Sequence, residues 1–494
     1  MRLHRVCQAH LSQAKVGGRD VVDRALIAGL NMSNSLGSVV EGTVTVSETG
    51  AYSASGNHFL VPIGDGLSIQ TGLLHEVCFT EVSPLALDLT LLLGAVKCAD
   101  RSVRRLHGRG WARRLQLKIP VYELATWRQS DVAVSLIDVL QYLTGDSWQI
   151  DFVKRRKKPE CTGQAPLFAS PSRPRAFIPF SRGLDSYAQS ELLTVNSSER
   201  EVIRVHLKAS RGERSMKSLG QAAKQQLTPV PVAANVNEPK HAEQSYRTRP
   251  FLYDSLAAYA AVLSKGGVVV IPENGQGSLG GSLIRMGSEA PHRSCHPGFT
   301  TRLSRLLACL TGEQISFEHP ALFQTKGQVL SALLKVQSAS DAWLLKHPSC
   351  SYDARHAHRN HKQVHCGVCG NCLLRRMSVH AAGIADPTPY KVNDLHAASL
   401  ASALMQGDEP PNLRAYTDIA RNAARSMQRM ADLVNSTEPY RVAAEIDGLA
   451  YYQGRARSEV REALSSMLDQ HSREWRAFLE HTGKSSWVTQ FARE

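Results

Sequence analysis

From residue 175 onward the chain alternates short apolar runs with segments of helical apolar spacing. We predict strands at 175–180, 202–207, 229–236, 267–272 and 314–319, and helices at 186–194, 216–227, 251–266, 301–312 and 327–336. The run at 267–272 is built mainly of Val and Ile, as expected of a parallel strand that is buried on both faces. This alternation predicts an α/β fold with a doubly wound parallel sheet.

Further regions precede and follow this alternation. Residues 1–154 are predicted to form an N-terminal α/β domain, with strands at 39–47, 114–123 and 147–153 and a helix at 132–143. The basic, proline-rich stretch at 155–174 is interpreted as a linker, and 175–390 as the central domain. Residues 391–494 are predicted to be mostly helical, with breaks near 408–411 and 436–440.

The charge balance favours anionic partners. The chain of 494 residues has 58 Lys and Arg against 44 Asp and Glu, a net charge of +14. Such a surplus suits phosphorylated ligands or nucleic acid, although a generally basic surface explains it equally well. The N-terminal residues lack the apolar segment of a secretory signal, and no apolar run reaches the roughly 18 residues of a membrane span. We therefore expect a cytoplasmic protein without a membrane partner.

The first strand of the central region leads into a loop that is suited to phosphate. Residues 181–186 read Ser-Arg-Gly-Leu-Asp-Ser and precede a predicted helix, whose free N–H groups and dipole would attract an anion. Ser181 and Ser186 can donate hydroxyl hydrogen bonds, and Gly183 lets the backbone approach a ligand closely. Asp185 can hold Mg²⁺ or brace the loop. A capped helix that binds nothing is the alternative.

A second motif, within residues 347–376, is the most specific stretch of the chain. Four cysteines follow the spacing C-x15-C-x2-C-x2-C, at Cys350, Cys366, Cys369 and Cys372. Four thiolates suit tetrahedral Zn²⁺, and the further cysteine that a ferredoxin-like cluster needs is replaced by Arg376. Because all four ligands are cysteines, we predict a structural site. The neighbouring histidines are predicted to lie in a solvated loop; they are His356, His358, His361 and His365.

The loop motif Ser-x-Gly-x-Asp-Ser resembles the pyrophosphate loop of the ATP-pyrophosphatase (PP-loop, HUP-type) enzymes. These enzymes bind ATP and transfer AMP to a carboxylate-type oxygen, with release of pyrophosphate. The resemblance implies that ATP and Mg²⁺ bind to this loop, which consists of Ser181, Arg182, Gly183, Leu184, Asp185 and Ser186. Arg182 departs from the family pattern, which has glycine there. Its side chain could add a positive charge beside the phosphates or obstruct the loop.

Both motifs together resemble the 7-cyano-7-deazaguanine synthases, the QueC family, over about residues 175–380. The cysteine part matches the family pattern CGxCxxCxxR at 366–375. Members adenylate 7-carboxy-7-deazaguanine, form an amide and then dehydrate it to a nitrile. The resemblance implies catalytic roles for Asp185, Arg249 and Lys326. Glu273 and Asn274 are predicted to read the purine-like edge of the substrate, although Asn-Gly is equally a turn signal.

The regions outside 175–380 point to a specialised member. Enlarged forms with an added N-terminal α/β domain resemble the QueC-like proteins of antiphage defence operons, most of all the QatC type of the Qat operon. That resemblance implies a reaction that stops at the amide and attaches the deazaguanine to the N-terminus of a partner protein from the same operon. The flanking regions would recognise this partner, so removing 1–154 should abolish transfer and leave pyrophosphate release.

Two alternatives remain open at this stage. The first is a free-standing synthase that makes the nitrile for nucleoside biosynthesis and needs no partner protein. The second is a non-catalytic nucleotide-binding scaffold, which the basic charge and Arg182 would allow.

Overall fold

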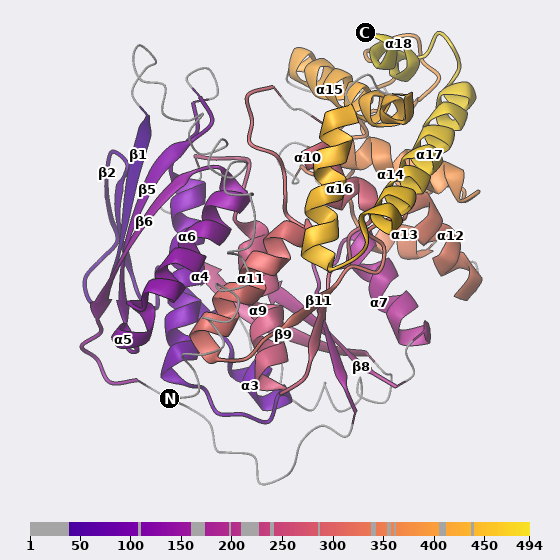
Figure 1. Cartoon of the computed structure of the whole chain (residues 1–494). Coiled ribbons are helices and arrows are strands. Elements are labelled where there is room, and N and C mark those ends of the chain that lie inside the picture. The colour runs from indigo at the N-terminus through magenta and orange to yellow at the C-terminus, as the bar shows by residue number, and fades with distance from the viewer. Residues whose placement is uncertain are drawn as a thin grey trace.

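The computed structural model describes residues 39–106, 110–159, 173–196, 199–208, 227–237, 242–284, 287–336, 342–352, 357–359, 362–404, 412–435 and 439–494. They form two large sheets separated by helices, a small two-stranded sheet and a helical C-terminal region (Figure 1). The helix predicted at 216–227 lies outside the described residues, except for its last residue, which begins a strand. Within the described ranges, no helix combines the length and apolar character needed to cross a bilayer.

The first sheet is built from residues 40–154 and has the strand order β2-β3-β1-β5-β6. Its strands are β1 (Val40–Ser47), β2 (Ser53–Ser55), β3 (His58–Pro62), β5 (Arg113–Val121) and β6 (Ser147–Lys154). All neighbours are parallel except β2, which pairs antiparallel with β3. Buried and exposed residues alternate along β1 and β6 because one face is covered, by α4 (Pro84–Ser102) and α6 (Ser130–Thr144). The short helix α5 (Leu124–Trp127) connects β5 to α6.

The second sheet contains the predicted doubly wound parallel core. Its order is β11-β10-β7-β8-β9-β4, and its strands are β4 (Leu67–Gln70), β7 (Arg175–Pro179), β8 (Glu201–Lys208), β9 (Leu227–Val236), β10 (Val268–Val270) and β11 (Ser316–Glu318). From β7 the chain adds β8 and β9 on one side, then β10 and β11 on the other, all in parallel. The order therefore reverses between β7 and β10, where open α/β sheets bind their ligands.

Helices cover both faces of this sheet. One face carries α9 (Arg249–Leu263) and α11 (Pro297–Thr311), and the other carries α7 (Leu184–Asn196) with α12 (Lys326–Val336) packed beside it. The helix α10 (Gly275–Leu283) follows β10 directly. These elements confirm the predicted alternation of strands and helices after residue 175 within the described ranges.

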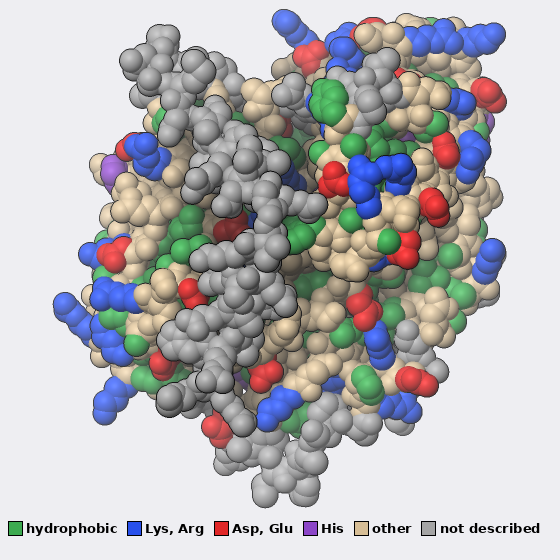
Figure 2. Space-filling view, viewed as in Figure 1, with side chains coloured by type: hydrophobic (Ala, Val, Ile, Leu, Met, Phe, Trp, Pro, Cys, Tyr) green, Lys and Arg blue, Asp and Glu red, His purple; other side chains and the backbone are tan. Residues whose placement is uncertain are grey.

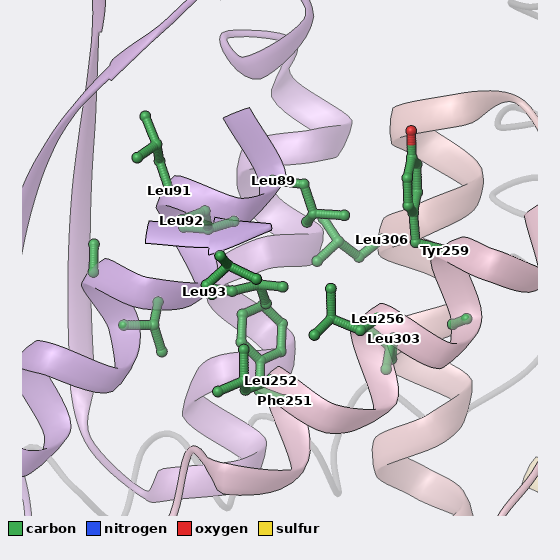
Figure 3. Packing of buried hydrophobic residues seen from close by; sticks show 14 of the residues in the cluster. Leu89, Leu91, Leu92, Leu93, Phe251, Leu252, Leu256, Tyr259, Leu303 and Leu306 are labelled. Carbon is green, nitrogen blue, oxygen red and sulfur yellow. The ribbon is translucent and has the colours of Figure 1, made fainter. Parts of the chain in front are cut away.

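The N-terminal region shares a sheet and a core with the central region. β4 pairs antiparallel with β9, so it completes the second sheet from outside the predicted central domain. It is followed by α3 (Gly72–Val77), which packs near β9. Leu92 and Leu93 of α4 lie in one hydrophobic cluster with Leu256 of α9 and Leu303 of α11 (Figure 3). The division of the chain into domains stays a prediction, but these parts are joined by continuous packing.

The C-terminal region is helical, as predicted. It contains α15 (Leu413–Asp432), the 3-10 helix η3 (Leu433–Asn435), α16 (Pro439–Gln453), α17 (Arg457–Thr482) and α18 (Trp487–Arg493). It is preceded by α13 (Ala342–Lys346), by the two-residue strands β12 (His358–Arg359) and β13 (Lys362–Gln363), and by α14 (Gly370–Ala381). On the face drawn in Figure 2, Lys and Arg side chains are scattered among acidic ones. The described residues drawn on this face therefore form no continuous basic stripe of the kind that tracks nucleic acid.

Candidate functional site

The loop between β7 and α7 occupies the reversal point of the sheet. The hydroxyl of Ser186 donates to the carbonyl oxygen of Gly183 at 3.0 Å and lies 3.3 Å from the Ser181 hydroxyl. The N–H of Gly183 donates to Ser181 Oγ at 3.2 Å. The two serines are thus brought together over one turn, with Ser181 exposed and Ser186 buried. This arrangement suits an anion at the start of α7.

Arg182 has the backbone conformation that favours glycine. Its φ of +61° lies in the left-handed region, which side chains with a Cβ rarely adopt. The guanidinium Nη2 lies 3.3 Å from His206 Nε2 at the end of β8, and the Arg182 carbonyl oxygen accepts a hydrogen bond from His347 Nδ1 at 3.1 Å. Burial and the charge of Arg182 lower the pKa of His206 to about 4, so the neutral imidazole can accept from the guanidinium.

Leu184 contributes to the loop through its backbone alone. Its side chain is fully buried in a hydrophobic cluster with Leu330 and Leu333 of α12. It anchors the first turn of α7 to α12, so any contact of Leu184 with a ligand would come from its N–H group.

Four of the predicted site residues meet at this point. Lys326 Nζ, at the start of α12, lies 2.7 Å from Asp185 Oδ2 in the first turn of α7. The amide of Asn274, after β10, donates to Asp185 Oδ1 at 2.9 Å and to Glu273 Oε1 at 2.7 Å. These side chains come from three segments that the sheet topology brings to one edge.

Glu273 is held at the open end of α10. Asn274 is the N-cap of this helix, and its Oδ1 accepts from the N–H of Gly277 at 3.0 Å. A side chain at position 277 would collide with the Glu273 carboxylate, so the glycine is what permits this placement. Burial and the neighbouring carboxylate of Asp185 raise the pKa of Glu273 to about 8, although Lys326 acts in the opposite direction. Glu273 can therefore be neutral or ionised near neutral pH.

Two residues of α17, His471 and Glu474, form hydrogen bonds that fix these segments in place. His471 Nδ1 lies 2.8 Å from Gln276 Nε2, and the Oε1 of Gln276 accepts from the N–H of Lys326 at 2.8 Å. Thr325 donates its hydroxyl to Glu474 Oε1 at 2.6 Å. Sequence reasoning missed both His471 and Glu474, because no motif in α17 links them to residues so far away along the chain.

Arg249 is not joined to this cluster by any hydrogen bond or ion pair among the described residues. It is exposed at the first residue of α9, with its guanidinium 5.3 Å from the ring centre of Tyr253. The preceding N-cap residue, Thr248, donates both its N–H and its hydroxyl to Asp100 Oδ2, at 2.8 and 3.0 Å. The start of α9 is therefore fixed by the N-terminal region.

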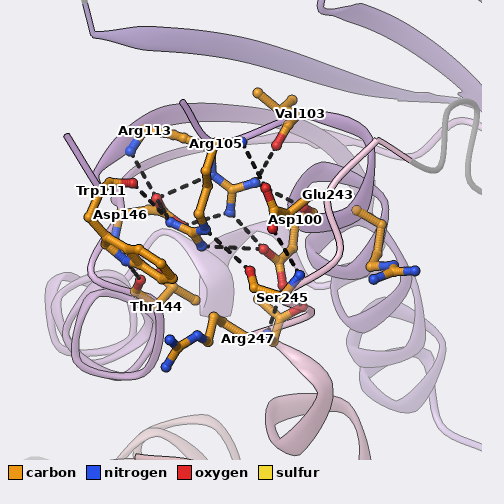
Figure 4. Close-up of polar contacts among 12 residues, drawn as sticks. Asp100, Val103, Arg105, Trp111, Arg113, Thr144, Asp146, Glu243, Ser245 and Arg247 are labelled. Atoms are coloured by element: carbon orange, nitrogen blue, oxygen red, sulfur yellow. Dashed lines mark hydrogen bonds and ion pairs between the residues drawn. The ribbon is translucent and has the colours of Figure 1, made fainter. Parts of the chain in front are cut away.

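Asp100 belongs to a fully buried network of charges (Figure 4). Arg105 forms two hydrogen bonds to Asp146, at 2.6 and 2.7 Å. Arg113 contacts both Asp100 and Asp146, at 2.6 and 2.8 Å. Since opposite charges are paired and hydrogen-bonded, the network meets the conditions under which buried ions are tolerated. It connects the first sheet to the segment that leads into Arg249.

Sequence reasoning also missed Cys295 and Asp254, two titratable residues near the charges of this site. Burial raises the pKa of the Cys295 thiol, and the charges of Glu273, Asp254 and Asp185 add to this effect. Asp254, on α9, is buried and its Oδ2 has no hydrogen-bond partner among the described residues. Neither residue lies in a pattern that signals chemistry, although an acidic residue within an apolar helical face was a weak cue.

The four predicted zinc ligands converge. The sulfurs of Cys350, Cys366, Cys369 and Cys372 lie within 4.8 Å of one another. The Sγ atoms of Cys366 and Cys372 are 3.7 Å apart, close to the roughly 3.8 Å expected for two thiolates on tetrahedral zinc with Zn–S bonds of about 2.3 Å. Gly367 has a φ of +86°, and a side chain there would collide with the Val392 carbonyl. The donor set therefore fits Zn²⁺ with no position left for a substrate.

The interpretation of the neighbouring histidines as solvated was wrong for His365. This residue is buried, its Nε2 accepts from the N–H of Ser349 at 3.1 Å, and its ring packs beside Tyr390. The physical reason is that the backbone of His365 pairs with Tyr390 in a short bridge, which draws the ring inward. His358 is exposed, as expected, whereas His356 and His361 lie outside the described residues.

The fold and the site define an α/β protein with a loop suited to phosphate at the reversal point of its sheet and a separate centre of four cysteines.

No protein-family model matches the chain. Three curated relatives are 7-cyano-7-deazaguanine synthases. The protein of Ruegeria pomeroyi is 30% identical over 112 residues, which are 22% of this chain and 43% of that protein. The protein of Ruegeria sp. strain TM1040 is 29% identical over 123 residues, 24% and 47% respectively. The protein of Rhizobium etli is 47% identical over 38 residues, 8% and 16% respectively.

These similarities are local. The chain spans less than half the length of each of these relatives. They show a local similarity to 7-cyano-7-deazaguanine synthases, and the activity of this chain belongs to the proposal that follows.

Proposed function

We propose that this protein uses ATP to adenylate the carboxylate of a 7-carboxy-7-deazaguanine-type purine and then forms an amide, as a QueC-like enzyme of antiphage defence. The observation that supports this most is the meeting of Asp185, Lys326 and Glu273 beside the 181–186 loop at the reversal point of the sheet. The local similarity to 7-cyano-7-deazaguanine synthases supports the choice of substrate class.

The reaction can be written with these residues. A carboxylate oxygen of the purine attacks the α-phosphorus of ATP, so that an acyl-adenylate forms and pyrophosphate leaves. The 181–186 loop would hold the pyrophosphate, and Lys326 would offset its charge. Asp185 offers a carboxylate for Mg²⁺, which would neutralise phosphate charge when bound. The carboxylate of Glu273 can accept from N–H groups of a purine edge, and Asn274, whose amide donates to Asp185 and Glu273, would hold that carboxylate in place.

Amide formation completes the cycle. An amine attacks the acyl carbon and loses a proton, and AMP leaves with the bonding electrons. We propose that the amine is the N-terminus of a partner protein from the same operon, that Arg249 supports this step, and that the protein acts in the cytoplasm. Zn²⁺ at the four cysteines would supply a structural cross-link.

A second candidate is a synthase that makes the free nitrile. The names of the curated relatives favour it, since each is a 7-cyano-7-deazaguanine synthase. The two candidates share the acyl-adenylate and differ in what happens to it.

One experiment addresses both candidates. Purified protein is incubated with ATP, Mg²⁺ and 7-carboxy-7-deazaguanine, with and without ammonia, and pyrophosphate and AMP are measured. We expect pyrophosphate release that Asp185→Asn abolishes and that the matched exposed-site control Asp131→Asn retains. Mass spectrometry of co-expressed operon proteins then looks for a deazaguanine adduct, whereas the free nitrile would support the synthase. Wild-type protein that releases no pyrophosphate would contradict both candidates and favour a scaffold.

A further inference from the structure

A cavity lies among α12, α14 and α17, behind the first turn of α12. Its volume is about 280 Å³, just below the roughly 300–1,000 Å³ that is usual for small-molecule sites. Gln328, Ser331 and Lys335 line it from α12, and Gln470 and Glu474 from α17. These polar groups converge on one space although no catalytic or metal role explains them.

Glu474 is the unusual member of this lining. Its side chain belongs to a residue that is only 6% exposed, yet it is acidic. Oε1 accepts from Thr325 at 2.6 Å and from Gln470 at 2.9 Å. Oε2 is buried and has no hydrogen-bond partner among the described residues. A buried carboxylate oxygen without a donor is costly, so its presence needs an explanation.

No neighbouring cation within the described part of the chain satisfies this oxygen. Arg473, next to Glu474 in sequence, donates to Gln470 Oε1 at 2.7 Å instead. Lys335 lines the cavity, is exposed and forms no ion pair with Glu474 among the described residues. The lining thus combines a buried acceptor with an exposed positive charge. A ligand with an ammonium group at one end would supply the missing donor.

We propose that this cavity binds a small molecule through a primary ammonium group, which donates to Oε2 of Glu474. Two sources share this chemistry, a simple alkylamine and a zwitterion whose carboxylate would face Lys335. The proposal does not rest on the function proposed above. It places the ligand beside Thr325, which directly precedes Lys326. Binding of the ligand would therefore affect the position of Lys326 in the candidate site.

Isothermal titration calorimetry with three probes tests the proposal, namely propylammonium chloride, 4-aminobutyrate and sodium butyrate, at matched ionic strength. We expect the amines to bind the full-length protein with Kd on the order of 1 mM and butyrate to bind at least about tenfold more weakly. Glu474→Gln should weaken amine binding by about tenfold or more, because a charged hydrogen bond is lost. Glu480→Gln, an exposed change on the same helix, should not. If the protein prefers 4-aminobutyrate and Lys335→Met removes this preference, the natural ligand is a zwitterion. If both amines bind equally well, the natural ligand is a simple alkylamine.

A second variant distinguishes a loss of amine binding from a folding defect. Ala332→Leu fills the cavity from the opposite helix, α12, and leaves Glu474 in place. It should abolish amine binding while the melting temperature stays within about 3 °C of the wild type. Equal amine affinity in the wild type and both variants would overturn the proposal. So would butyrate binding as tightly as the amines, or wild-type protein that binds neither amine at about 50 mM.

Discussion

Arg182 adopts a left-handed backbone at the centre of the candidate ATP loop, with its guanidinium beside His206. We predict that Arg182→Gly stabilises the fold by about 0.5–1 kcal/mol, because glycine relieves the strain but costs chain entropy. The same change should weaken ATP binding by several-fold, since the charge beside the loop is lost. Chemical denaturation and calorimetry with ATP measure the two effects.

Arg182→Lys serves as the control for this prediction. It keeps the charge and the backbone strain, so both stability and ATP affinity should stay near the wild type. Tighter ATP binding by Arg182→Gly would show instead that the arginine obstructs the loop.

The raised pKa of Glu273 predicts that the stability of the folded protein depends on pH. Its pKa is raised to about 8 in the folded protein, above its ordinary value of 4.5, so the folded state holds the proton more tightly. Its contribution to stability is therefore full below about pH 4.5 and is lost as pH rises through about 8. Glu273→Gln should remove this decline, worth roughly 2 kcal/mol after screening by solvent. Urea denaturation at pH 5.5 to 8.5 measures it, and parallel pH profiles of the two proteins would contradict it.

At the scale of elements, the cysteine cluster packs against the C-terminal helices and so links them to the central region. Cys366 and Cys372 share a buried cluster with Trp475 of α17 and Trp487 of α18. Cys369→Ala should therefore remove zinc and give poorly soluble protein, since zinc binding in structural sites is worth on the order of 10 kcal/mol and is coupled to folding. Metal analysis and thermal melting check this, with Cys309→Ala on α11 as the control. Soluble, metal-free wild-type protein with normal melting would refute it.

The elements that could be predicted are those whose signals are local. The strands β7 to β10 appear as apolar runs because buried parallel strands need no polar face, and the cysteine motif is compact in sequence. β4 was missed because four residues carry no recognisable period, and its place is decided by β9. The support from α17 was missed for a similar reason, since Thr325 and Glu474 are 149 positions apart. Family resemblance implied catalytic roles for Asp185 and Lys326, but the contact between them depends on the reversal point of the sheet and was not predicted.

At the scale of the whole molecule, the shared core changes the expectation for truncation. The sequence suggested that a protein without 1–154 would keep partial activity. Removing this region would take away α4, which packs against α9, and α6, which packs against α11, so the cluster that contains Leu256 and Leu303 would be opened and β9 would lose its edge partner. We now predict insoluble or aggregating protein, because such a loss exposes a large apolar face. Soluble expression and size-exclusion chromatography test this. A monomeric truncated protein that still releases pyrophosphate would restore the earlier expectation.

The antiparallel pairing of β4 with β9 also delays the completion of the second sheet during synthesis on the ribosome. Gln70 leaves the ribosome about 160 residues before its partner Ala233, a delay of roughly 10–30 s at ordinary elongation rates. During that interval Leu67 and Ile69, both buried in the finished protein, have no sheet to join. A pause in translation before residue 227 would therefore lengthen the period in which the N-terminal half depends on chaperones.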